Sequence, residues 1–250
     1  MAEGSAGVIG AAAGRPIAGR KPRKFYVALS VLLVVIIAVG FWPSYYGPLM
    51  RGAAEAPLIL HIHGVIYAGW MALLIAQTVL AARGRIRAHR ALGKFGIGYG
   101  TLVFLLGLVV SFVAPVMHVR AGEWPVDQAA GFLPIPLIDM LLFGGFFFPA
   151  LAYRSKPELH KRLMLLATIA LLFAAAFRLN AAGWLPLSVA VGLWFVPVAL
   201  GMAYDWIQQR RVYLVYVIGV IAMAVSLVRL SLGTNETWMA IGRPIIEALI

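Results

Sequence analysis

Four ionisable side chains that lie within long apolar runs are the residues of this sequence best suited to chemistry. They are His63, Asp139, Arg178 and Arg229. Charged groups are costly inside hydrocarbon, so each needs a partner or a function. Asp139 is the only acid well within an apolar run, and Arg229 or Arg178 can supply its countercharge while His63 shares a proton. We predict an outward-facing polar pocket for a small solute, an ion or a proton. The alternative is a structural Asp–Arg pair with snorkelling arginines.

Neighbouring residues limit what else joins this pocket. His61 and His63 are two positions apart, about 200° around a helix, so at most one of them faces the bundle. Gly64 leaves room beside His63, and we assign His61 to lipid headgroups. Gln77 is the only amide deep in the predicted bilayer. We expect Gln77 to hydrogen-bond a neighbouring helix or to line the pocket.

Two further histidines, His89 and His160, suggest a cofactor site. Each opens an apolar run on the same predicted membrane side, in similar basic surroundings. Two neutral imidazoles at one depth can hold a haem iron between them or share a transition metal. Electrons or protons would then pass by His63, the third candidate residue for this chemistry. The alternative is a basic rim that binds lipid phosphate, with both histidines in water.

Several other kinds of site are excluded by residues that the chain lacks. It contains no cysteine, which rules out disulfides, thiolate metal sites and cysteine catalysis. None of its lysines lies mid-membrane, so a retinal Schiff base has no attachment point. No histidine follows His160, which removes the last-span histidine pair of a zinc hydrolase of the adiponectin-receptor type.

The elements that position these residues are membrane-spanning helices. The chain is 62% hydrophobic and 12% charged, with a mean hydropathy of +0.92. About 20 apolar residues cross the hydrocarbon as a helix, and lipid offers the backbone no hydrogen-bond partners. We predict an all-α, polytopic seven-helix bundle over residues 25–232. Its spans are expected at 25–42, 57–82, 95–116, 132–153, 157–179, 184–205 and 212–232.

The distribution of Lys and Arg predicts the orientation of the bundle. With a cytoplasmic N-terminus, the inner side holds 16 of these residues and the outer side 5. This asymmetry predicts a multi-pass protein of a bacterial plasma (inner) membrane with its C-terminus outside. The basic inner face is expected to attract anionic lipid headgroups. Nothing in the sequence indicates nucleic-acid binding.

We predict separate roles for the two terminal segments and for the glycine-rich third span. Residues 1–24 are predicted to be a disordered basic cytoplasmic tail. Residues 233–250 form a short outer segment, either an interfacial helix or a frayed tail. The third span is rich in glycine, and Gly96 and Gly100 are four residues apart. That spacing favours close helix packing, and it also suggests a face for a homo-oligomer or for a membrane-complex partner.

Three sequence segments carry a resemblance to known membrane proteins. They are His61–Ile62–His63–Gly64 with Trp70 and Gln77; Gly84–Arg85 to His89–Arg90–Ala91–Leu92–Gly93; and His160–Lys161–Arg162–Leu163–Met164 with Arg178. Together they resemble an uncharacterised family of bacterial multi-span membrane proteins over spans 2 to 5. A weaker similarity connects them to b-type cytochrome membrane proteins and haem–copper oxidase assembly factors, which also carry histidines at helix ends.

The resemblance to four-helix b-type cytochromes is incomplete. Those proteins place paired histidines at both depths, whereas here His63 lacks an outer partner unless His118 turns inward. Three hypotheses therefore stay open. The protein binds haem b or a metal at its inner rim, transports a small solute or a proton through the outer pocket, or serves as a non-catalytic membrane subunit or assembly factor.

Overall fold

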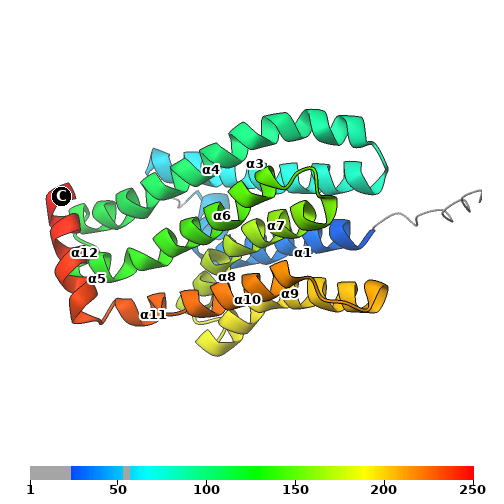
Figure 1. Cartoon of the computed structure of the whole chain (residues 1–250). Coiled ribbons are helices and arrows are strands. Elements are labelled where there is room, and N and C mark those ends of the chain that lie inside the picture. Colours follow the sequence, from blue (N-terminus) through cyan, green and yellow to red (C-terminus); the bar gives the residue numbers. More distant parts are fainter. Residues whose placement is uncertain (1–23, 53–56) are drawn as a thin grey trace, which may run out of the picture.

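The computed structural model describes residues 24–52 and 57–250 and contains only helices in that part of the chain (Figure 1). The expected tail over residues 1–24 lies outside the described residues, except for Lys24. The helices are α1 (Lys24–Phe41), a π-helix η1 (Trp42–Tyr46), α2 (Gly47–Met50), α3 (Leu58–Ala82), α4 (Ile86–Arg120), α5 (Val126–Phe132), α6 (Pro134–Ala152), α7 (Pro157–Ala170), α8 (Leu172–Ala181), α9 (Leu187–Gln209), α10 (Leu214–Ser226), α11 (Arg229–Leu232) and α12 (Glu236–Leu249).

Seven of these helical stretches in the described residues are long and apolar enough to cross a membrane. Their bounds are Lys24–Met50, Leu58–Ala82, Ile86–Arg120, Val126–Ala152, Pro157–Ala181, Leu187–Gln209 and Leu214–Leu232. The predicted all-α, seven-span architecture is confirmed. The third and fourth helical stretches begin earlier than predicted, at Ile86 and Val126, because helix continues past the apolar run into polar sequence.

The fifth span, made of α7 and α8, lies at the centre of the bundle. In its most apolar window 72% of the residues are buried, whereas no other span exceeds 39%. It contacts α1, α6, α9 and α10. Large side chains such as Phe143, Phe147, Phe173 and Trp194 are fully buried around it. The surrounding helices instead turn valine, leucine and isoleucine side chains outward, as a lipid-facing surface requires.

The bundle has two distinct ends. The inner end, named from the predicted orientation, carries the start of α1 and the turns α3–α4, α6–α7 and α9–α10. Helix α4 has 35 residues and α3 has 25, and both meet at the inner turn over residues 83–85. Because a helix rises ~1.5 Å per residue, α4 extends about 15 Å farther at the outer end.

At that outer end, α4 is joined by α5 and α12 in an outer cap that has its own small core. Figure 1 shows α12 lying across the ends of the long helices. The core of the outer cap is formed by Val116, Ala129, Ala130, Leu133, Met239 and Ile246. The Asn235 side chain accepts a hydrogen bond from the Trp238 N–H, which caps α12. The Trp238 indole then donates to the Ala130 carbonyl at 2.9 Å, so the segment after residue 233 is a docked helix.

Candidate binding site at the helix interruptions

Four of the seven spans contain a change of helix type within the described structure: the π-helix η1 follows α1 in the first span, and one or two residues of right-handed helical conformation separate α5 from α6, α7 from α8 and α10 from α11. The last three interruptions each have a local cause or signature. Leu133 separates α5 from α6 and is followed by Pro134, which has no N–H to continue a helical ladder. At Leu171, between α7 and α8, the N–H bonds the carbonyl three residues earlier. Leu227 and Val228, between α10 and α11, do the same. Such tight turns within a helix often mark functional positions.

Arg229 connects the last three of these interruptions. It is the first residue of α11, its Nη1 donates to the Ile135 carbonyl near the start of α6 at 3.4 Å, and its guanidinium lies 3.6 Å from the ring centroid of Phe173 near the start of α8. The ring of Trp194 is also close, at 5.0 Å. The guanidinium therefore lies against two neighbouring aromatic rings, whose centroids are 5.0 Å apart, at the point where three interrupted spans meet.

Arg229 forms a buried ion pair with Asp139 on α6. Its Nη1 donates to the Asp139 Oδ1, and the two residues are only 1% and 3% exposed. The other two guanidinium nitrogens, Nε and Nη2, are buried and have no hydrogen-bond partner in the described part of the chain. Three of the five N–H donors of the Arg229 guanidinium are therefore unused among the described residues.

Arg178 and His63 complete the arrangement. Arg178 on α8 lies within electrostatic range of both Asp139 and His63, and its guanidinium is 4.4 Å from the ring centroid of Phe41. The His63 ring lies 4.0 Å from that of Tyr67, and its Nδ1 is buried without a partner among the described residues. Tyr67 donates to the Val103 carbonyl at 3.0 Å.

We call His63, Tyr67, Asp139, Arg178 and Arg229 the outer polar cluster. The structure brings together four of the five residues predicted for the outer pocket. Tyr67 was missed, although its position one helical turn after His63 is a usable signal. Gln77 lies elsewhere: it is 14 residues further along α3, about 21 Å towards the inner end, where its carbonyl lies beside His89.

His89 and His160 lie together at the inner end. The Nδ1 of His89 is 3.3 Å from the Gln77 carbonyl, and the Nδ1 of His160 is 2.8 Å from the Ala150 carbonyl. A carbonyl only accepts hydrogen bonds, so each Nδ1 is the donor and each neutral ring carries its lone pair on Nε2. The two rings interact electrostatically. His63, their predicted companion, lies at the opposite end of α3. No group of three or more metal-ligating side chains occurs in the described ranges.

A second buried ion pair, which was not predicted from the sequence, lies near the inner end. Arg162 on α7 was counted among the basic residues of the inner connections, yet it is fully buried. Its Nε and Nη2 each donate to one oxygen of Asp205 on α9 at 2.6 Å. Its Nη1 donates to the Glu158 carbonyl and side chain, and its guanidinium lies 3.4 Å from the Tyr213 ring centroid. Because its guanidinium donors are paired in this way, we assign Arg162 a structural role.

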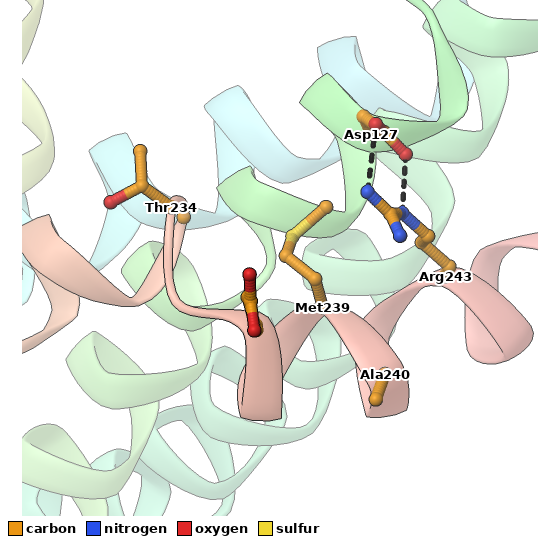
Figure 2. A pocket seen from close by; sticks show the side chains of 7 residues that line it. Asp127, Thr234, Met239, Ala240 and Arg243 are labelled. Atoms are coloured by element: carbon orange, nitrogen blue, oxygen red, sulfur yellow. Dashed lines mark hydrogen bonds and ion pairs between the residues drawn. The ribbon is translucent and has the colours of Figure 1, made fainter.

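The outer cap contains a surface hollow of about 450 Å³, which is lined by Asp127, Gly233, Thr234, Glu236, Met239, Ala240 and Arg243 (Figure 2). Arg243 donates from Nε and Nη2 to the two oxygens of Asp127, at 2.5 and 3.0 Å. That carboxylate raises the pKa of the Arg243 guanidinium, which keeps the pair charged. Both side chains are about half exposed or more, so this contact ties α12 to α5 at the surface.

Comparison with models of protein families, with curated proteins and with solved structures gave no match for this chain. Helix length and hydropathy nevertheless establish an integral, multi-span membrane protein.

Proposed function

We propose that the protein is a small-solute or proton-coupled transporter of a bacterial plasma membrane and that the outer polar cluster is its binding site. The observation that carries this proposal is the meeting of three interrupted spans at Arg229. Many secondary transporters place their substrate between discontinuous helices, because the broken helices present backbone groups and can move against each other. A purely structural ion pair needs no such interruptions.

The chemistry of the outer polar cluster suits coupled binding of a solute and a proton. Two guanidinium groups face a single carboxylate, with His63 as a neutral neighbour. A solute that first binds the cluster and then draws Arg229 away from Asp139 as it moves on would leave Asp139 without its direct countercharge. An isolated carboxylate is costly in a medium of low dielectric constant, so Asp139 would then take up a proton. Release of the solute would restore the ion pair and return that proton.

Flux measurements on reconstituted protein test this proposal. Liposomes loaded with a pH-sensitive dye receive inward gradients of labelled lactate, succinate, glycine, glucose or chloride, and both uptake and lumenal pH are followed. We expect at least one solute to enter faster than into protein-free liposomes. Asp139→Asn should abolish this flux while the variant still inserts and elutes as a folded protein. Arg243→Lys, in the outer cap, is the matched control and should keep the flux.

Two results would contradict the proposal. If folded wild-type protein gives no flux above protein-free liposomes for any of these solutes, the transporter assignment is wrong. If Asp139→Asn retains full flux, transport does not use the outer polar cluster.

One observation favours a second function at the inner end. His89 and His160 both direct Nδ1 to a backbone carbonyl, which is how protein side chains that ligate metals through Nε2 are commonly oriented. These two residues would hold haem b or a transition metal, which would supply one-electron redox chemistry when bound. The absorbance spectrum and metal content of purified protein test this. We expect a Soret band or stoichiometric metal that is lost in His160→Ala and kept in His118→Ala; a colourless, metal-free wild type would rule it out.

A further inference from the structure

The three arginine–aspartate pairs named above use different edges of the guanidinium group. Arg162 and Arg243 each hold both oxygens of one aspartate with Nε and Nη2. Those two N–H bonds point in the same direction, and their spacing matches the two oxygens of a planar carboxylate. This edge of the guanidinium is thus the carboxylate-binding edge in two independent parts of the chain.

Arg229 departs from this pattern. It meets Asp139 through Nη1, on the opposite side of the guanidinium. Its Nε and Nη2 edge is buried and makes no hydrogen bond with any described residue. Buried hydrogen-bond donors are nearly always paired, because a donor that loses its water without gaining another acceptor destabilises the fold. Two unsatisfied donors on one edge match an acceptor that has two oxygens.

The surroundings of Arg229 specify the charge of that acceptor. Arg178 and Arg229 contribute two positive charges, and Asp139 is the one carboxylate within the outer polar cluster. A single additional negative charge would neutralise the cluster, and neutrality is strongly favoured in the low dielectric of a membrane interior. The Phe173 and Trp194 rings hold the guanidinium plane in place, so the edge is oriented before a ligand arrives.

We infer that the outer polar cluster binds a small monocarboxylate, whose two oxygens accept hydrogen bonds from Nε and Nη2 of Arg229. His63 Nδ1 is another buried atom without a partner among the described residues, and its ring lies within electrostatic range of Arg178 in the same cluster. This inference uses the site of the proposed function and adds the class of its ligand. It does not depend on the ligand crossing the membrane.

Equilibrium binding to detergent-purified protein tests the inference separately from transport. The probes are matched pairs of an anion and its neutral amide: acetate with acetamide, lactate with lactamide, and benzoate with benzamide. Isothermal titration calorimetry measures each dissociation constant. We expect saturable binding of at least one carboxylate and at least about tenfold weaker binding of its amide, because the amide lacks the charge and offers one acceptor oxygen.

Variants assign the binding to the proposed edge. Arg229→Lys keeps the positive charge but removes the planar edge, so carboxylate binding should weaken by about tenfold or more. Arg243→Lys removes an equivalent edge in the outer cap and should leave the dissociation constant unchanged. If Arg229→Lys does not fold, Asp139→Asn provides the second readout: it keeps the edge, removes the competing negative charge and should bind the carboxylate at least as tightly as wild type.

The outcomes separate this inference from the proposed function. Equal affinity for acid and amide, or no binding of any carboxylate by folded wild type, would overturn the inference. Carboxylate binding without any flux would keep the inference and reject the transporter. Flux of a neutral solute without carboxylate binding would keep the transporter and reject the inference.

Discussion

Arg162 holds Asp205 through two hydrogen bonds of 2.6 Å, and neither side chain is exposed to solvent. This contact joins α7, the inner half of the central span, to α9. The Tyr213 ring covers the guanidinium at 3.4 Å, which adds the start of α10 to the same point. At the inner end, all three guanidinium nitrogens of Arg162 donate hydrogen bonds. In the outer polar cluster, only Nη1 of Arg229 does so among the described residues.

Removing one partner of the inner pair should destabilise the whole bundle. In Asp205→Ala the Arg162 charge stays buried and keeps only Glu158 as a carboxylate partner; breaking a buried ion pair typically costs about 3–5 kcal/mol of unfolding free energy. Thermal or denaturant unfolding in detergent measures the change. Asp127→Ala breaks the pair with Arg243 at the surface and should cost much less, because water replaces the lost contact. Equal losses in the two variants would contradict this assignment of roles.

Two glycines of α4 should respond oppositely to the same substitution. A Cβ on Gly100 would collide with the rings of Phe147 and Trp70, whereas a Cβ on Gly98 meets nothing within 4 Å. We expect Gly100→Val to destabilise the protein by about 1–3 kcal/mol, since overpacked cores must shift. Gly98→Val should melt like wild type in detergent. A large loss in Gly98→Val only after reconstitution would instead indicate that a partner covers this position.

The absence of cysteine makes the predicted orientation directly testable. Glu123→Cys places a thiol in the outer connection between α4 and α5, and Arg154→Cys places one in the inner turn between α6 and α7; both positions are exposed. In right-side-out vesicles, an impermeant maleimide should label the first variant at once and the second only after permeabilisation. The unmodified chain is the blank. The inverse labelling pattern would mean that the bundle inserts the other way round.

Anionic lipid should gather at the α3–α4 turn rather than at the α6–α7 turn. The first turn and the start of α4 present five exposed cations that form no ion pair with described residues: Arg83, Arg85, Arg87, Arg90 and Lys94. In the second turn, Arg154 bonds the Leu151 carbonyl at 3.1 Å and Lys156 lies over the Tyr153 ring. Both turns are therefore basic, but only the cations of the first turn make no ion pair, hydrogen bond or aromatic contact among the described residues.

Native mass spectrometry with phosphatidylglycerol compares the two turns. Replacing Arg85, Arg87 and Arg90 by Gln should weaken lipid retention by about fivefold per charge, which corresponds to ~1 kcal/mol for each basic residue at the surface. The double variant Arg154→Gln and Lys156→Gln should retain the lipid, and phosphatidylcholine should bind both proteins equally poorly. Losses in proportion to the three and two charges removed would show that headgroups respond only to total charge.

The depth of each polar residue could be read from the sequence, but its partners could not. Asp139 had two candidate cations, and both lie near it in the structure; only the geometry of α11 shows that Arg229 makes the hydrogen bond. Lys161 and Arg162 are adjacent and looked alike as inner charges. A rotation of about 100° between successive helical residues turns Arg162 into the bundle towards Asp205 and leaves Lys161 nearer the surface.

The sequence by itself determined that this chain crosses a membrane seven times as helices, because hydrophobic length and backbone hydrogen bonding are properties of each segment alone. Tertiary structure decided which polar groups meet. The α5–α6, α7–α8 and α10–α11 interruptions converge on Arg229 only after the spans have packed, since that convergence depends on the rotation and depth of helices far apart in the chain. The sequence also placed His89 and His160 at one end of the bundle, whereas only the structure shows that each Nδ1 lies against a backbone carbonyl.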